Sequence, residues 1–140
     1  MIKIKIISTG KFKEEWLKLA IEEYQKRLSP WMQFEWVLFK SEEELYKEAQ
    51  KEKNLVALSP DGAIYDSEQF SQMVMDLIEK SQSRLSILIG GAFGIPKEIL
   101  KKVPTISLSK LTWSHQTVRL LIMEQLYRAF EIQKGSSYHK

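Results

Sequence analysis

The chain has 140 residues, of which 44% are hydrophobic and 28% are charged, a composition typical of one globular domain with a substantial core. It contains no cysteine and only two histidines, which excludes disulfides and cysteine nucleophiles and argues against a zinc or iron site. The net charge of +3 is compatible with an anionic partner, and no apolar run suits a membrane span or signal peptide, so we expect a cytoplasmic protein.

The first third of the chain predicts two strands with a helix between them. Residues 2–6 alternate isoleucine with lysine, which is typical of a strand with one buried face. Apolar residues recur at helical spacing from Glu14 to Leu28, and Ser29-Pro30 ends that helix. Residues 33–39 are rich in aromatic and β-branched side chains and predict a second strand.

The middle of the chain predicts two helices on either side of a short strand. Ser41 can cap a helix, and a glutamate three residues later can complete a capping box. Leu55–Leu58 is an apolar strand that we expect to end in a turn at Ser59–Gly62. Asp66 can cap the next helix, whose apolar stripe extends from Ser67 to Lys80.

A glycine-rich turn follows the next strand. The apolar run Ser86–Ile89 stops at Gly90 and Gly91, a third glycine follows after two intervening residues, and Pro96 is expected at the first position of a helix. Glycine lets the backbone come close to a ligand, but the same residues serve a plain turn with positive φ. The glycine pattern alone leaves both interpretations open.

The last strand leads through a polar loop into the longest helix. A short strand is expected from Thr105 to Leu108, then a loop rich in serine and threonine, then a helix from about Gln116 to Ile132. Strands and helices thus alternate throughout residues 1–140 without a linker or repeat. This predicts a single α/β domain with a doubly wound, mainly parallel sheet. Ligands of such sheets bind in the crevice outside the carboxyl ends of the strands.

Motifs in the last third of the chain resemble one known family. They are Ile89-Gly90-Gly91, the Leu-Ser-x-Leu-Thr-x-x-His run from Leu108 to His115, Leu126-Tyr127-Arg128-Ala129, and the closing Tyr138-His139-Lys140. Together they look like the RlmH family of SPOUT-class methyltransferases, and the resemblance covers the whole chain. The chain departs from the family pattern at Ala92-Phe93, where relatives often carry a polar second residue, and at Ser114, where many carry proline.

The resemblance implies a fold, a reaction and a partner. It implies a C-terminal trefoil knot, a topology that general rules of chain connection would reject. The implied reaction is methylation of N3 of a pseudouridine in 23S ribosomal RNA, at position 1915 of that RNA, with S-adenosylmethionine as methyl donor and no metal ion. The partner is therefore ribosomal RNA, in the large subunit or the assembled ribosome, and the enzyme is expected to act as a homodimer.

The resemblance also assigns roles to residues. Backbone groups of three loops are expected to hold the donor, and these cofactor-binding residues are Leu58, Gly90, Gly91, Ser109, Lys110, Leu111, Thr112, Trp113 and Ser114. The N3 imide is nucleophilic only after it loses its proton, so a base or a cationic environment is required. Tyr138 and His139 are expected to assist there, near the donor of their own or a partner subunit, and Lys140 to contact RNA. His115, by its position just before the helix, is expected to be a structural hydrogen-bonding group at the helix start, with a catalytic role as the alternative.

The long helix carries two further predictions. Arg119 shares a helical stripe with apolar residues, so its charge needs a partner or an opening. Arg119 can form an ion pair with a loop carboxylate, or its aliphatic stem can carry the charge to water. The alternative is that Arg119 contacts an RNA phosphate or a second subunit. Residues 118–123 are apolar on nearly all sides, which predicts a homodimer seam, with a buried core helix as the alternative.

Two other function classes remain open on the residues alone. One is a non-catalytic ribosome- or RNA-binding module with the same fold. The other is a nucleotide-using α/β enzyme in which the turn at Gly90–Gly94 holds phosphate at a helix N-terminus. This second alternative lacks the Gly-Lys-Ser/Thr signature of a P-loop and the full glycine spacing of a dinucleotide site.

Overall fold

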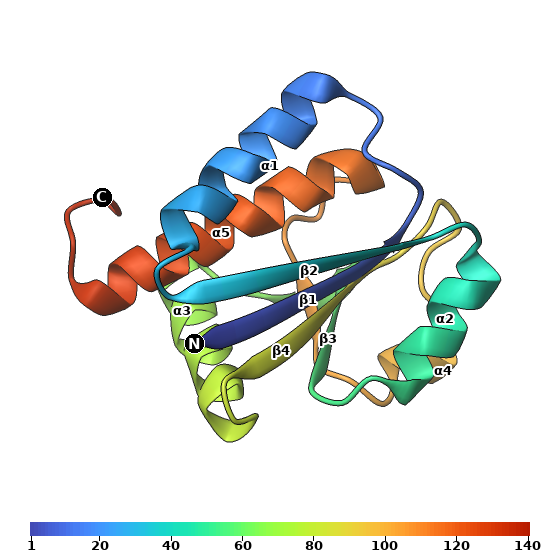
Figure 1. Ribbon diagram of the computed structural model, residues 1–140. Coiled ribbons are helices and arrows are strands. Elements are labelled where there is room, and N and C mark those ends of the chain that lie inside the picture. Colours follow the sequence, from blue (N-terminus) through green and yellow to red (C-terminus); the bar gives the residue numbers. More distant parts are fainter.

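In the computed structural model, which describes all 140 residues, five strands form one sheet (Figure 1). The strands are β1 (Ile2–Thr9), β2 (Met32–Phe39), β3 (Leu55–Ile64), β4 (Arg84–Ile89) and β5 (Thr105–Ser107). Their order across the sheet is β2-β1-β4-β3-β5, and every neighbouring pair is parallel. The helices are α1 (Glu15–Leu28), α2 (Glu42–Lys51), α3 (Ser67–Lys80), α4 (Lys97–Leu100) and α5 (His115–Lys134). None of the helices is long and apolar enough to cross a membrane.

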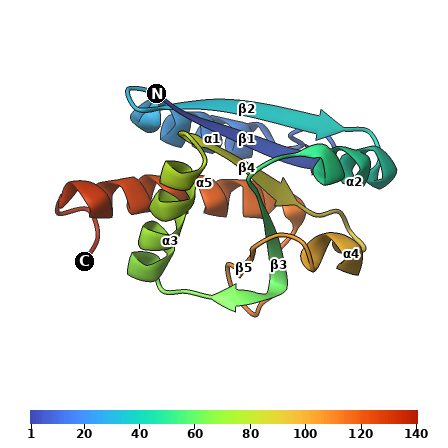
Figure 2. The ribbon, with the colours of Figure 1, turned by 90° about the horizontal axis from the view of Figure 1, so that it is seen from below.

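Helices cover both faces of the sheet (Figures 1 and 2). Because side chains alternate along a strand, Ile4 and Ile6 of β1 point into the larger core, shared with α1, α3 and α5. Ile7 points into the smaller core, which contains buried side chains of α2 and α4. The predicted doubly wound parallel sheet is therefore confirmed, whereas the trefoil knot stays a prediction.

Side-chain caps begin three of the helices, two of them at the predicted residues. The Ser41 hydroxyl accepts the Glu44 amide at 3.2 Å, which is half of the predicted capping box. Asp66 and Gln69 form a complete box at the start of α3. Ser114 accepts the Thr117 amide at 3.1 Å, so α5 begins at His115, one residue earlier than predicted. Local capping chemistry thus places each helix start.

Strand β3 extends beyond its predicted end. The turn predicted at Ser59–Gly62 is wrong, because the strand continues through Pro60 to Ile64. Its pairing with β5 shifts register between Leu58 and Ala63, so the polar segment bulges out of the ladder and Pro60 needs no ladder partner for its missing N–H. At Gly62 the two strands lie so close that an added Cβ would be 2.7 Å from the β5 backbone.

Candidate functional site

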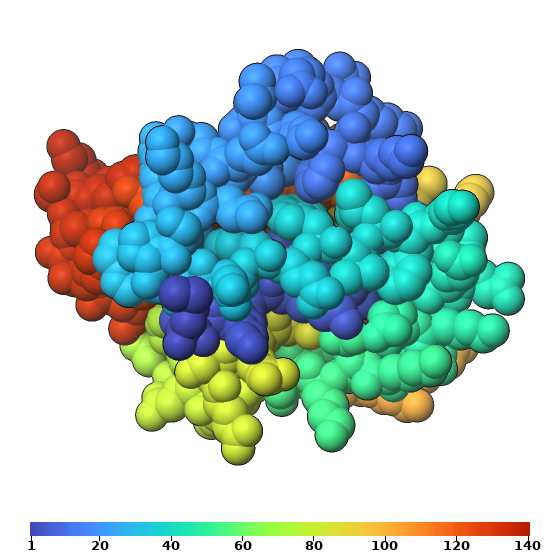
Figure 3. Space-filling model, in the orientation of Figure 1, coloured from blue at the N-terminus to red at the C-terminus, as the bar shows by residue number.

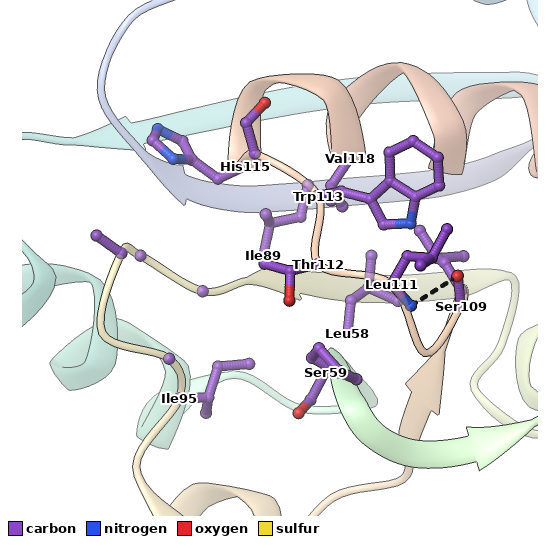
Figure 4. A pocket seen from close by; sticks show the side chains of 17 residues that line it. Leu58, Ser59, Ile89, Ile95, Ser109, Leu111, Thr112, Trp113, His115 and Val118 are labelled. Atoms are coloured by element: carbon purple, nitrogen blue, oxygen red, sulfur yellow. Dashed lines mark hydrogen bonds between the residues drawn. The ribbon is translucent and has the colours of Figure 1, made fainter.

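A cavity of about 450 Å³ lies beside the bulge of β3 that follows Leu58 and outside the carboxyl ends of β4 and β5 (Figure 4). These three strands are neighbours in the sheet, so the β3 bulge and the segments that follow β4 and β5 meet at one edge. Leu58, Ile89 and Val118 contribute apolar side chains to its wall. The mixture of apolar wall and loop backbone is typical of small-molecule sites.

All but one of the predicted cofactor-binding residues line the cavity. Lys110 is the exception, because its side chain is exposed and does not line the cavity. The sequence interpretation missed several other lining residues, which are Ser59, Pro60, Ile89, Ala92, Gly94, Ile95, Leu108, His115 and Val118. Most of them are next to predicted residues in the chain, and this position was the one signal in the sequence that could have indicated them. Cofactor binding at these residues stays a prediction.

The Tyr46 hydroxyl holds the glycine-rich turn in place. Gly94 N–H donates to the Gly91 carbonyl at 3.1 Å, which closes a four-residue turn. Gly91 N–H donates to the Tyr46 hydroxyl at 3.1 Å, and that hydroxyl donates to the Gly94 carbonyl at 2.8 Å. Both ends of the turn are thus attached to α2 by one side chain. Burial raises the pKa of the Tyr46 phenol, which therefore keeps the proton that this arrangement needs.

The two glycines at the end of β4 are closely packed within the chain itself. A Cβ on Gly91 would collide with the side-chain carboxylate of Glu42, and a Cβ on Gly90 would be 2.7 Å from the Ile95 side chain. Only Gly94 of this turn has a positive φ, of 80°. Close approach of the Glu42 and Ile95 side chains, more than left-handed backbone, therefore favours glycine at positions 90 and 91.

The loop after β5 forms the opposite wall of the cavity (Figure 4). The Ser107 hydroxyl donates to the Ser109 carbonyl at 2.8 Å, and the Leu111 amide donates to the Ser109 hydroxyl at 2.9 Å. These bonds fold the loop tightly and leave Leu111 and Trp113 exposed. The loop therefore presents backbone and apolar side chains to the cavity.

His115 lies at the cavity where α5 begins. Burial is the main cause of its lowered pKa, and the positive charges of Arg119 and Lys13 lower it further. The imidazole is therefore neutral near pH 7. No group of three or more His, Asp or Glu side chains is arranged to hold a metal ion.

Arg119 is fully enclosed, with 0% of its surface exposed. One of its terminal nitrogens donates to the carbonyls of Thr9 and Gly10 at 2.6 and 2.8 Å, and its guanidinium lies 5.0 Å from the centre of the Phe12 ring. Its other two nitrogens have no hydrogen-bond partner. Two of the predictions for Arg119 are therefore wrong. The side chain forms no ion pair with a loop carboxylate, and its stem does not carry the guanidinium to water. Contact with RNA phosphate stays a prediction, and in this arrangement the charge faces the interior.

The C-terminal residues pack against α5 of their own chain. The Tyr138 ring meets Tyr127 edge-on at 4.8 Å and its hydroxyl donates to Glu124 at 3.3 Å. Arg128 donates to Nδ1 of His139 at 3.0 Å. The tail thus has a folded position on α5. It lies at the end of the molecule away from α2 and α4 (Figures 1 and 3), so Tyr138 and His139 do not line their own cavity.

The fold and cavity define a class of α/β domain with a cavity of small-ligand size at one edge of a parallel sheet. Comparison with known proteins narrows this class. A family model described as "Predicted SPOUT methyltransferase" matches residues 2–139. The chain belongs to the SPOUT methyltransferase family, and it is an enzyme of that methyl-transfer class.

Similar curated proteins share one name, "Ribosomal RNA large subunit methyltransferase H". The protein from Protochlamydia amoebophila is 46% identical over 140 residues, with all of both chains covered. That from Streptococcus uberis is 42% identical over 159 residues, covering 99% of this chain and 100% of the relative. That from Clostridium kluyveri is 38% identical over 157 residues, covering 98% and 99%. These full-length matches confirm the resemblance found in the sequence motifs.

Proposed function

We propose that this protein methylates N3 of a pseudouridine in 23S ribosomal RNA, at position 1915, with S-adenosylmethionine as methyl donor. The observation that supports it most is the cavity at the ends of β3, β4 and β5, which gathers the donor loops of the family pattern. The names of the similar proteins support ribosomal RNA as the substrate. The enzyme would then act in the cytoplasm, where ribosomes are.

The lining of the cavity suits this donor. Its volume of about 450 Å³ lies within the range of small-ligand sites, and the loop backbone at Gly91 and Ser109–Ser114 offers amides and carbonyls to adenine and ribose. Leu58, Ile89 and Val118 would pack against the flat adenine ring. Bound S-adenosylmethionine supplies an activated methyl group on a sulfonium. The protein's part is to exclude water and align the acceptor nitrogen in line with that group.

The acceptor must lose its N3 proton before or during the transfer. We assign assistance in this step to Tyr138 and His139, acting in the cavity of a partner subunit. Within one chain these residues lie against α5, away from their own cavity. Lys140 follows them directly and would contact the RNA phosphates. A second copy therefore completes each site.

Exposed apolar side chains support a homodimer. Trp16 is 61% exposed and Leu19 is 55% exposed, one helical turn apart on α1. Helix α5 packs beside α1, and Leu120 and Leu121 of the predicted seam are only partly buried. These exposed apolar side chains of α1, with the partly buried ones of α5, suit contact with a second copy of the chain.

The test combines ligand binding with transfer. Calorimetric titration should detect S-adenosylmethionine binding, with no comparable binding of ATP or NAD. The protein should then transfer a methyl group to ribosomes from a strain that lacks its gene, and mapping should place the product on the proposed pseudouridine. Binding of ATP or NAD in preference to S-adenosylmethionine, or methylation of another nucleotide, would contradict the proposal.

Deletion of Tyr138–Lys140 tests the role of the tail. Turnover on ribosomes should fall below detection, while S-adenosylmethionine affinity should stay within about twofold because the tail does not line the cavity. The melting temperature should fall only slightly, since the deletion removes two partly buried rings at the surface of the protein. The variant His139→Ala separates loss of the imidazole from loss of the whole tail. Wild-type turnover of the truncated protein would refute this role.

A further inference from the structure

The glycine-rich turn presents an aromatic ring to solvent. Phe93 is 93% exposed, which makes it the most exposed of the large hydrophobic side chains. A phenyl ring in water forgoes the free energy that burial provides. The position also departs from the family pattern, in which a polar residue is common here. The exposed ring is therefore free to contact a binding partner.

The turn that carries Phe93 cannot easily fold the ring back onto the protein. Gly91 and Gly94, on either side of the pair Ala92-Phe93, are bonded to each other and to the Tyr46 hydroxyl. Tyr46 in turn belongs to α2, whose neighbouring Leu45 and Ala49 are buried in the smaller core. The ring is consequently held at the tip of an anchored turn.

Phe93 stands at the rim of the cavity without being part of its wall. The residues before and after it, Ala92 and Gly94, both line the cavity, whereas Phe93 does not. A donor bound in the cavity would therefore leave the ring free. A substrate that reaches the cavity along this turn would meet the exposed ring.

We propose that Phe93 stacks on an unpaired base of the RNA substrate next to the target nucleotide, with Tyr46 as the positioning residue of the turn. This inference rests on the proposed function. Proteins that recognise single-stranded RNA stack splayed bases on exposed aromatic rings. Phe93 is a single ring flanked by Ala92 and Gly94, and the exposed and unpaired Lys97 is nearby in the chain. This arrangement suits a base and its phosphate. A protein partner would need a wider apolar patch.

The test compares three substitutions at one position. Phe93→Ala should raise KM for ribosomes about tenfold or more, the effect expected for loss of one base stack. Phe93→Trp should retain near wild-type KM, whereas Phe93→Leu, which keeps apolar bulk without a π-face, should resemble Phe93→Ala. The dissociation constant for S-adenosylmethionine and the melting temperature should stay unchanged in all three, because the side chain is exposed and outside the cavity.

Several results would overturn the proposal. A Phe93→Leu variant as good as wild type would show a plain apolar contact, and weakened donor binding would place Phe93 in the cofactor site. Dissociation of a dimer would make it an interface residue. If the wild-type protein binds the donor but methylates no RNA, the proposed function fails. If the wild-type protein methylates RNA and Phe93→Ala does so with the same KM, only the inference about Phe93 is refuted.

The positioning role of Tyr46 has its own measurement. Tyr46→Phe removes the hydroxyl that joins Gly91 to Gly94 and should raise KM for ribosomes in the wild-type background. In a Phe93→Ala background the same change should have no further effect on that KM, because the ring it positions is gone. Equal effects in both backgrounds would show that Tyr46 does not act through Phe93.

Discussion

Arg119 carries a buried charge without an acidic partner. Its guanidinium bonds to backbone carbonyls of Thr9 and Gly10, and two nitrogens remain unsatisfied. Burial lowers its pKa to about 10, so it still carries its charge near pH 7 and desolvation opposes folding. Arg119 therefore fills a buried volume and links α5 to the segment at Thr9 and Gly10, but its charge is poorly compensated.

Replacement of Arg119 should therefore separate volume from charge. Arg119→Met keeps the apolar stem and should melt at or above the wild-type temperature, because an unpaired buried charge is removed. Arg119→Ala should melt roughly 5 °C lower or more, because it leaves a cavity that costs about 2–5 kcal/mol. Thermal unfolding of both variants checks this. A Met variant as unstable as the Ala variant would show that the carbonyl hydrogen bonds outweigh the desolvation.

His115 should make stability depend on pH. Its pKa is lower in the folded protein than the ordinary 6.5, so the unfolded chain binds more protons between these two values. The free energy of unfolding therefore rises with pH through that window and falls as the solution is acidified. His115→Gln should lose less stability than wild type between about pH 7 and pH 5. Parallel melting curves across this range would contradict the effect.

At the scale of elements, local signals placed most helices and strands. Helix α3 has the predicted bounds, and α1 begins one residue after its prediction, because amphipathic period and caps are properties of nearby residues. The end of β3 was missed because Pro60 and Gly62 are turn residues by composition, whereas their conformation depends on β5, over 40 positions later in the chain. The folded position of Tyr138 was likewise invisible, since Glu124 and Tyr127 hold it.

The close contact of β3 with β5 predicts that Gly62 is required. Gly62→Ala places a Cβ 2.7 Å from the backbone of Thr105 and Ile106, and neither strand can yield without loss of pairing. We expect a loss of about 1–3 kcal/mol in stability and weaker S-adenosylmethionine binding, because β5 leads into the cavity loop. Asp61→Ala, an exposed change in the same bulge, is the control. Chemical denaturation and calorimetry measure both effects, and an unaffected Gly62→Ala would contradict the packing.

At the scale of the molecule, the cavity was predictable because loops after parallel strands meet at one sheet edge. The strand order that makes β3, β4 and β5 adjacent came from the structure, and so did the acceptors of Arg119, which lie more than 100 residues away. Helix periodicity placed Arg119 on the inner face of α5 but contained no information on these partners.

The homodimer should depend on the apolar face of α1. Light scattering should give about twice the chain mass of 16.4 kDa at micromolar concentration. Leu19→Glu and Trp16→Glu place a charge in the proposed contact and should shift the protein to monomer, with loss of turnover but not of the fold. Lys18→Glu, an exposed change between them, should leave the dimer intact. A monomeric wild-type protein would refute the dimer.

The tie between Arg119 and residues 8–10 also governs how this chain can fold during synthesis. It joins positions 109–111 residues apart, and β1 lies in the middle of the sheet beside a strand that begins only at Arg84. Such non-local contacts make folding slow. Most of α5 must leave the ribosomal exit tunnel before the larger core can close, so the nascent chain exposes that face of β1 for most of its translation.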